Sequence, residues 1–348
     1  MERTGFDRIP VRYYAEPPVN TMLMDYFGYS TKEELHRALG VDLRYVQPIY
    51  CGPKPQTFPD GSRTLVYPDR GWPVPTRYKD VAYSGGTYTE AIYRPFANIK
   101  DPSELDHFDF PTADWLDYSS IRQECETLSE FAIVTGTPGM LDFINGIGHS
   151  RGIEQVFMDI ALADPVYLTL MEKKYQYHYE MMERTLQAAR GRIDIVQTGE
   201  DLGSQEGLLI SPRKFDELLA PLHKEFNAMV HRYEARTMMH CCGSCRNLIP
   251  RLIEIGLDIL DVVQTSAARM DIKELHDEFG RELSFCGTVC VQSILPHFTV
   301  EKVIEEVERR LELFHDGGLI LGPSHLIQPG TPIENILAMY QAAGSIGT

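Results

Sequence analysis

The sequence predicts an α/β protein, specifically a (β/α)8 TIM barrel with an N-terminal extension. From about residue 130 onward, short apolar segments alternate with helical segments, a rhythm typical of a parallel sheet with both faces covered. Chemically reactive side chains directly follow several of these apolar segments, as they do in barrels whose active sites lie at the carboxyl ends of the strands. Because no glycine-rich fingerprint follows an early strand, a doubly wound dinucleotide-binding sheet is not favoured.

Residues 1–75 are predicted to form the N-terminal extension, which packs on the barrel. This part is rich in Pro, Tyr and Arg and contains one clear helix, which begins at the capping-box sequence Ser30-Thr31-Lys32-Glu33 and ends at Gly40. The alternating residues 41–46 follow and indicate a strand. Many Pro and Gly residues over 52–85 indicate irregular or hairpin structure.

Residues 76–348 are predicted to be the barrel, in one structural domain with the extension. Seven strands can be recognised, and the eighth is expected between residues 80 and 100. Besides 41–46, the strands are expected at 131–134, 193–197, 236–239, 259–263, 283–285 and 319–321. Helices are expected near 150–162, 165–190, 244–255, 270–279 and 300–314, with others beginning at Ser211-Pro212 and at a second capping box, Thr331-Pro332-Ile333-Glu334.

Composition and charge argue against several classes of function. The chain has 348 residues, of which 43% are hydrophobic and 24% charged, as in a globular protein. There are 33 Lys and Arg against 50 Asp and Glu, and the resulting net charge of −17 argues against nucleic acid and anionic membranes as partners. No apolar stretch approaches the ~18 residues of a membrane helix, and the first residues show no secretory signal. We therefore expect a cytoplasmic protein.

Histidines and cysteines gather after three of the predicted strands. His240 and Cys242 follow one strand, Cys286 follows another, and His325 follows the last. Because alternate residues after a strand point in the same direction, His240 and Cys242 can bind one ion, and zinc accepts both ligand types. Either Cys286 or His325 would complete the site. The alternative is a hydrogen-bonded histidine beside thiols buried in the core.

Five further residues are candidates for catalysis or substrate binding. The adjacent carboxylates Glu200 and Asp201 follow another strand; such neighbours shift each other's pKa, so we expect acid–base chemistry or substrate orientation, with an ordinary polar loop as the alternative. Gln264 follows the strand at 259–263, His149 lies in a Gly-rich turn entering a helix, and Tyr14 lies in an aromatic N-terminal arm. These last three are predicted to contact the substrate.

Four sequence motifs in the second half of the chain point to a known superfamily. They are His240-Cys241-Cys242-Gly243-Ser244, Asp258-Ile259-Leu260-Asp261, Gly322-Pro323-Ser324-His325-Leu326-Ile327-Gln328-Pro329 and Pro332-Ile333-Glu334-Asn335-Ile336. Together they resemble the uroporphyrinogen decarboxylase superfamily, which also contains zinc-dependent, corrinoid-linked methyltransferases. The resemblance is strongest from about 190 to 340. It implies a (β/α)8 barrel with an N-terminal extension.

Features of the true decarboxylases are missing from this sequence. One arginine, Arg12, stands where they carry an Arg-rich motif that grips propionates, and no Asp near Val46 matches their Phe-Ser-Asp motif. An octacarboxylate needs charge partners, so porphyrinogen decarboxylation is not expected. The resemblance to the methyltransferase branch instead implies zinc bound by His240 and Cys242. His325 aligns approximately with a later cysteine ligand of that branch, and Cys286 is its rival.

The function implied by this resemblance is zinc-dependent methyl transfer between a small substrate and a corrinoid (cobalamin). A separate protein would carry the corrinoid, because the chain has no Asp-x-His-x-x-Gly motif. Methoxylated aromatics are the first substrates expected, as in a corrinoid-dependent O-demethylase. Two alternatives are a metal-free decarboxylase or lyase with His325 as proton donor, and a non-catalytic subunit that docks a corrinoid protein. The substrate, the direction of transfer and the oligomeric state, a homodimer included, are left open.

Overall fold

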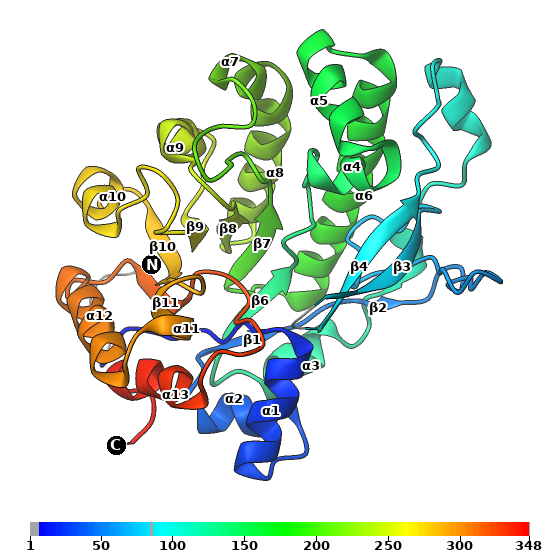
Figure 1. Ribbon diagram of the computed structural model, residues 1–348. Coiled ribbons are helices and arrows are strands. Elements are labelled where there is room, and N and C mark those ends of the chain that lie inside the picture. The colour runs from blue at the N-terminus through cyan, green and yellow to red at the C-terminus, as the bar shows by residue number, and fades with distance from the viewer. Residues whose placement is uncertain (1–6, 84–85, 348) are drawn as a thin grey trace.

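The computed structural model describes residues 7–83 and 86–347, and a parallel sheet with helices on its outside forms its centre (Figure 1). Seven strands pair in the order β1-β6-β7-β8-β9-β10-β11, each parallel to its neighbours. They are β1 Leu43–Tyr45, β6 Ala132–Gly136, β7 Ile195–Gly199, β8 Arg236–His240, β9 Ile259–Val263, β10 Ser284–Val289 and β11 Leu319–Pro323. The predicted α/β barrel class and its seven recognised strands are confirmed.

Residues around Val11 occupy the eighth position of the barrel, between β11 and β1. Val11 forms a parallel bridge with Leu321 of β11. The N–H of Arg12 donates to the carbonyl of Leu321, and the N–H of Leu321 donates to the carbonyl of Pro10, across the seam between the Val11 segment and β11. On the other side, the N–H of Asp42 donates to the carbonyl of Val11 at 3.0 Å. The expectation of an eighth strand between residues 80 and 100 was therefore wrong. The true segment escaped recognition because it is very short and begins at a proline.

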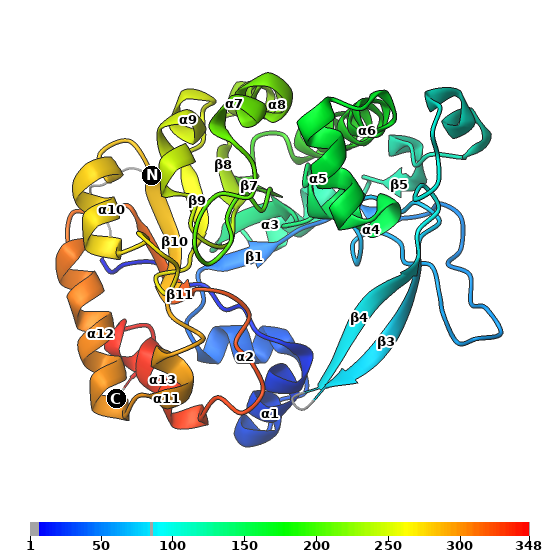
Figure 2. The same cartoon turned by 45° about the horizontal axis from the view of Figure 1, so that its top comes forward.

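The region between residues 80 and 100 instead contributes to an antiparallel hairpin. Its strands are β3 Arg77–Tyr83 and β4 Gly86–Tyr93, and the hairpin runs toward α1 (Figure 2), where Tyr83 and Tyr88 line a cavity together with Gln328 of the loop after β11. A second, smaller pair joins β2 Ile49–Tyr50 to β5 Leu116–Asp117, also antiparallel. Both additions lie outside the seven-stranded sheet.

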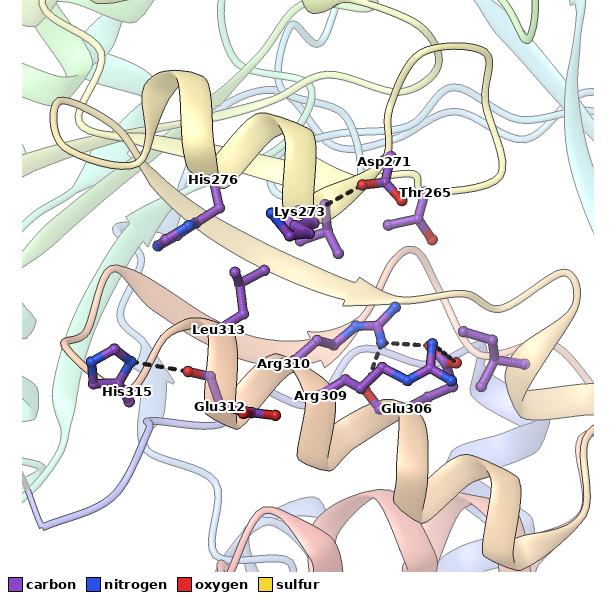
Figure 3. A pocket seen from close by; sticks show the side chains of 12 residues that line it. Thr265, Asp271, Lys273, His276, Glu306, Arg309, Arg310, Glu312, Leu313 and His315 are labelled. Carbon is purple, nitrogen blue, oxygen red and sulfur yellow. Dashed lines mark hydrogen bonds and ion pairs between the residues drawn. The ribbon is translucent and has the colours of Figure 1, made fainter.

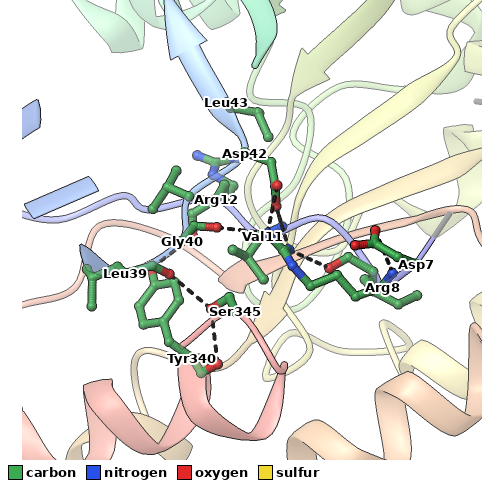
Figure 4. A network of polar contacts seen from close by, with 12 residues as sticks. Asp7, Arg8, Val11, Arg12, Leu39, Gly40, Asp42, Leu43, Tyr340 and Ser345 are labelled. Atoms are coloured by element: carbon green, nitrogen blue, oxygen red, sulfur yellow. Dashed lines mark hydrogen bonds and ion pairs between the residues drawn. The ribbon is translucent and has the colours of Figure 1, made fainter. Parts of the chain in front are cut away.

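Polar contacts fasten the N-terminal segment to the seam (Figure 4). The guanidinium of Arg8 donates to both carboxylate oxygens of Asp42, at 2.7 and 2.8 Å, and the N–H of Val11 donates to the same carboxylate at 2.7 Å. From the C-terminal helix, the hydroxyl of Tyr340 donates to the carbonyl of Arg12 at 2.9 Å. Residues from both ends of the chain therefore close the barrel.

Two layers of side chains stand inside the barrel. The lower layer is apolar and takes one residue from each of the seven strands: Leu43, Val134, Ile195, Met238, Ile259, Cys286 and Ile320. Because side chains alternate along a strand, residues two positions further on share the same side. In three neighbouring strands these are Gln197, His240 and Asp261, so a polar layer directly follows the apolar one toward the carboxyl ends.

Helices cover the sheet and connect its strands. They are α1 Pro17–Phe27, α2 Lys32–Ala38, α3 Ile121–Thr127, α4 Asn145–Arg151, α5 Ile153–Leu162, α6 Pro165–Ala189, α7 Pro212–Lys214, α8 Ala220–Arg232, α9 Ile249–Glu254, α10 Ile272–Phe279, α11 Ile294–His297, α12 Val300–Leu313 and α13 Ile333–Ala342. No helix in the described ranges is long and apolar enough to cross a bilayer.

Of the three helix starts for which the sequence predicted a capping residue, one is capped as predicted. Ser211 accepts from the N–H of Lys214 and caps α7 as expected. The capping box of α2 uses Thr31 with Glu34, one residue later than predicted, because Glu34 is the acid that reaches back to the N-cap. The second predicted box does not form: the Thr331 hydroxyl donates to the carbonyl of Gln328 instead of capping α13.

Candidate metal centre

Three side chains with metal-binding atoms meet at the carboxyl end of the barrel. His240 is the last residue of β8, Cys242 lies two residues further on, and His325 lies two residues beyond β11. Their ligand atoms all lie within 4.8 Å of one another, and Nε2 of His240 is 3.1 Å from Sγ of Cys242. Two imidazole nitrogens and a thiolate are donors that zinc accepts. Three protein ligands also leave a coordination position for substrate, as in catalytic zinc sites.

Cys286, the alternative to His325 as third metal ligand, lies in the apolar layer inside the barrel. Strand β10 continues to Val289, so Cys286 stands within the strand and not after its end, as we had expected. Its sulfur accepts from Nη1 of Arg12 at 3.1 Å, and burial raises the pKa of its thiol to about 12. The structure thus groups His325, and not Cys286, with His240 and Cys242.

A glycine shapes the loop that carries Cys242. Gly243 has φ +77°, and a Cβ at this position would lie 2.5 Å from the carbonyl oxygens of Gly203 and Ser204. Only glycine adopts this backbone conformation and allows this close approach without strain. The N–H of Gly243 donates to Oε1 of Gln264 at 3.0 Å, which fixes the same turn from the other side.

A buried carboxylate faces the inner nitrogen of His240. Oδ2 of Asp261 lies 3.5 Å from Nδ1 of His240 and accepts from Nε2 of Gln197 at 2.8 Å, while Oδ1 is paired with Arg12. Burial alone would raise the pKa of Asp261, but Arg12 and His240 lower it to about 2. Burial opposes the charging of His240, yet Asp261 and Cys242 raise its pKa well above the usual value. An anionic partner on Nδ1 leaves Nε2 for a metal, an arrangement common in histidine metal sites.

The two predicted catalytic carboxylates have different environments. Glu200 is fully buried and accepts from the backbone N–H groups of Phe143 and Ile144, both at 3.0 Å, so it anchors the loop after β6. Burial raises the pKa of Glu200 to about 8. Asp201 stays partly exposed beside the metal-binding group: its Oδ1 accepts from the N–H of Cys242 at 3.0 Å and lies 4.0 Å from Nε2 of His240.

Of the three predicted substrate contacts, two lie near the metal-binding group. Gln264 lines the adjoining cavity, and the ring of Tyr14 is 6.0 Å from that of His325 between centroids. His149 lies on α4 against the outer hairpin, with Nε2 3.5 Å from Nη1 of Arg70 and its ring 5.9 Å from that of Tyr78. His149 is not among the described residues that line the cavity beside the metal-binding group.

The cavity beside the metal-binding group has a volume of about 350 Å³. Cys242 and His325 line it together with Gln205, Gln264, Val291, Gln292, Ser324 and Gln328. These residues come from the loops that follow β7, β8, β9, β10 and β11. The cavity therefore lies where barrel enzymes bind substrate, with two of the three metal-binding side chains in its wall.

A larger hollow, of about 1020 Å³, lies on the outside of the barrel between α10 and α12 (Figure 3). Its walls carry charged side chains that already pair with one another, such as Arg310, which donates to the carboxylate of Glu306 at 2.9 Å. His240, Cys242 and His325 do not line this hollow, so we take the smaller cavity beside them, and not the larger hollow, as the candidate site.

Sequence reasoning missed the support beneath His240 and most of the cavity wall. Asp261 and Gln197 are polar residues inside otherwise apolar buried strands, and that contrast was a usable signal, since a buried charge needs a partner. Gln205 and Gln292 lie in loops without any distinguishing pattern, and Gln328 lies in the motif at residues 322–329, which did not indicate a place for it in the cavity wall.

Comparison with solved structures shows that the fold is shared with a known protein. A methyltransferase from Methanosarcina mazei has the same fold, with a TM-score of 0.65 and 16% sequence identity over 99% of this chain and 95% of that chain. A putative vitamin-B12 independent methionine synthase from Listeria monocytogenes gives a TM-score of 0.44 at 13% identity over 99% of both chains. A B12-independent methionine synthase from Shewanella sp. W3-18-1 gives 0.39 at 12% identity, over 77% of this chain and 72% of that chain. The last two are too distant to support an argument.

The sequence comparisons place the chain in a family. A search of curated proteins finds no match. The family model described as uroporphyrinogen decarboxylase (URO-D) matches residues 142–346, more than half of the chain, and this range includes His240, Cys242 and His325. The chain therefore belongs to the uroporphyrinogen decarboxylase family.

Proposed function

We propose that this protein is a zinc-dependent methyltransferase that moves a methyl group between a small substrate and a corrinoid carried by a separate protein. One observation carries the proposal: His240, Cys242 and His325 bring two nitrogens and a sulfur within 4.8 Å at the mouth of the barrel. The metal-free decarboxylase that the sequence left as an alternative would not use this donor set. The fold shared with the Methanosarcina methyltransferase supports the proposal.

Each residue of the site has a role in this proposal. Zinc bound by His240, Cys242 and His325 would supply Lewis acidity toward the substrate atom that carries the methyl group. Asp201 accepts a hydrogen bond from the backbone N–H of Cys242 and keeps its partly exposed carboxylate beside the metal-binding group. The amide of Gln264 orients the substrate from the cavity wall.

The remaining residues hold this arrangement in place. Glu200 fixes the loop after β6, and Nδ2 of Asn145, the first residue of α4, donates to Oδ2 of Asp201 at 2.7 Å. Tyr14 closes the side of the site next to His325. We propose a methoxylated aromatic as the methyl donor, because an ether oxygen becomes a better leaving group when a Lewis acid polarises it.

The first test is the metal content of the purified protein by elemental mass spectrometry. We expect about one zinc per chain in the wild type and a loss of zinc in His240→Ala, Cys242→Ser and His325→Ala. Cys241→Ser is the matched control, because Cys241 is a buried thiol of the same loop outside the metal-binding group. Wild-type protein without metal, or zinc retained in all three variants, would refute the zinc site and favour a metal-free lyase.

The second test separates metal binding from methyl transfer. Zinc-loaded protein is incubated with 2-methoxyphenol and cob(I)alamin, and the absorbance change from cob(I)alamin to methylcobalamin is followed. We expect turnover with the wild type and Cys241→Ser and none with His240→Ala. A zinc-loaded protein that transfers no methyl group from any methoxyarene, to free cobalamin or to a corrinoid protein, would refute the reaction and leave the metal site intact.

A further inference from the structure

The cavity beside the metal-binding group is lined by amides. Four glutamines line it, each from a different loop: Gln205 after β7, Gln264 after β9, Gln292 after β10 and Gln328 after β11. Among the described lining residues, the ionisable ones are Cys242 and His325, and both belong to the metal-binding group. The wall thus offers hydrogen bonds to a ligand but no lysine, arginine or carboxylate for an ion pair.

The charges nearest to this wall are already balanced. Asp201 accepts from the Cys242 N–H and from Asn145, and Arg12 is buried in its pair with Asp261 beneath the site. With a divalent ion bound, the Cys242 thiolate and the Asp201 carboxylate neutralise its two positive charges. A carboxylate or ammonium on the substrate would therefore lose its hydration without meeting an opposite charge, which is unfavourable.

The hydrogen bonds within the wall decide which amide atoms remain for a ligand. Oε1 of Gln264 accepts from Gly243 at 3.0 Å, and Nε2 of Gln264 donates to the hydroxyl of Ser266 at 3.5 Å, so one of its two N–H groups is left for a ligand. Oε1 of Gln292 accepts from the same Ser266 hydroxyl at 2.9 Å, so the Nε2 donor of Gln292 is left. Nε2 of Gln328 donates to the carbonyl of Leu326 at 3.0 Å, so its Oε1 acceptor is left. Donors and an acceptor around one small cavity suit a neutral group such as a hydroxyl or an ether.

We propose that the substrate of this site is uncharged near its methyl-bearing atom and is held by the amides of Gln264, Gln292 and Gln328. The inference rests on the proposed metal site and narrows its substrate class. It excludes donors whose carboxylate, sulfonate or ammonium group lies next to the reacting atom. Neutral methoxyphenols belong to the accepted class.

Small thiols of nearly equal size test this without knowledge of the natural substrate. The protein is loaded with Co²⁺ in place of zinc, and 2-mercaptoethanol, 2-mercaptoacetate and 2-mercaptoethylamine are titrated in, their binding followed by sulfur-to-cobalt absorption. Each dissociation constant is expressed for the thiolate. All three share the sulfur that binds the metal and differ in the charge at the other end. We expect the neutral thiol to bind at least 10-fold more tightly than either charged thiol.

Charge variants of the wall give the control. Gln328→Lys should favour the anionic thiol over the neutral one by at least 10-fold relative to the wild type, and Gln328→Glu should favour the cationic thiol. Glu312→Lys changes charge in the outer hollow between α10 and α12 and should leave the wild-type order unchanged. If Glu312→Lys shifts the order as strongly as Gln328→Lys, the effect comes from net charge and the inference is wrong.

The possible failures are distinguishable. Charged thiols that bind the wild type as tightly as the neutral one, or thiols that do not perturb bound Co²⁺, overturn the inference while the metal site stands. The expected order of thiols together with no methyl transfer from any methoxyarene supports the inference and refutes the proposed reaction. Wild-type protein that binds neither Zn²⁺ nor Co²⁺ refutes both.

Discussion

Replacing Asp261 by asparagine should weaken both zinc binding and folding, and the two effects should be separable. The Asp261 carboxylate faces Nδ1 of His240 at 3.5 Å, so its charge and position favour the orientation in which Nε2 is presented to the metal. Carboxylates behind a metal-binding histidine typically contribute a factor of about 10–100 to metal affinity. We therefore expect the zinc dissociation constant of Asp261→Asn to rise by about 10–100-fold.

The effect on folding has a different origin. Asp261 and Arg12 are fully buried and paired, and Asp261→Asn leaves the Arg12 guanidinium without its counter-charge. Removing one partner of a buried ion pair costs about 3–5 kcal/mol, whereas replacing both partners by residues of similar volume is often close to neutral. The double variant Arg12→Met/Asp261→Asn should therefore recover most of the lost stability without recovering zinc affinity.

Two measurements check this reasoning. Urea unfolding of the zinc-free proteins gives the stability of the wild type, the single variant and the double variant, and competition with a chromophoric chelator gives their zinc affinity. The d–d spectrum of the Co²⁺-loaded single variant should also change, because the His240 ring is held less firmly. Zinc affinity of Asp261→Asn within twofold of the wild type would refute the orienting role. A double variant no more stable than the single one would refute the ion-pair argument.

Three further predictions concern folding and the loop at the site. Gly243→Ala should unfold at least about 1 kcal/mol more easily and bind zinc more weakly, because its Cβ would meet two carbonyl oxygens at 2.5 Å; wild-type urea midpoint and zinc content would contradict this. His178 is fully buried, accepts from the N–H of Leu141 at Nδ1 and contacts the carbonyl of Gly71 at 2.8 Å, so burial lowers its pKa well below the usual value. His178 binds a proton near pH 6.5 in the unfolded chain but stays neutral in the folded state. The free energy of unfolding therefore falls as the pH drops below this value, by about 1.4 kcal/mol per pH unit from this group. His178→Gln should flatten the decline in urea midpoint between pH 7.5 and 5.5, and an unchanged slope would be evidence against it. Asp42→Ala should lower the melting temperature measurably by removing the contacts that hold the N-terminal segment, while the exposed Asp114→Ala should not.

The sequence predicted the barrel well because its strands are buried on both faces. Segments such as 259–263 are apolar at every position but one, and periodic helices separate them, so element type could be recognised from composition and spacing. The segment at Val11 could not be recognised in this way. Its strand character comes from pairing with Leu321, about 310 residues away, and not from any local pattern.

The site was predicted where residue type and strand position coincide. His240 ends strand β8, Cys242 and His325 follow strand ends, and the structure brings the three together. Cys286 was misplaced because the end of β10 was set four residues too early, at 285 instead of Val289. Glu200 illustrates a different limit: its backbone partners come from the loop after β6, and no local pattern shows whether a loop carboxylate points into a cavity or into the interior.

The seam at Val11 also determines when the site can be completed during synthesis. Arg12 is made 249 residues before Asp261, and its segment must wait for β11, near the end of the chain, before its second neighbour exists. A nascent chain that ends before Leu319 therefore pairs the Val11 segment on one side only, through Asp42, and it lacks His325 of the metal-binding group. We therefore expect metal capture by all three side chains only after the last strand has left the ribosome.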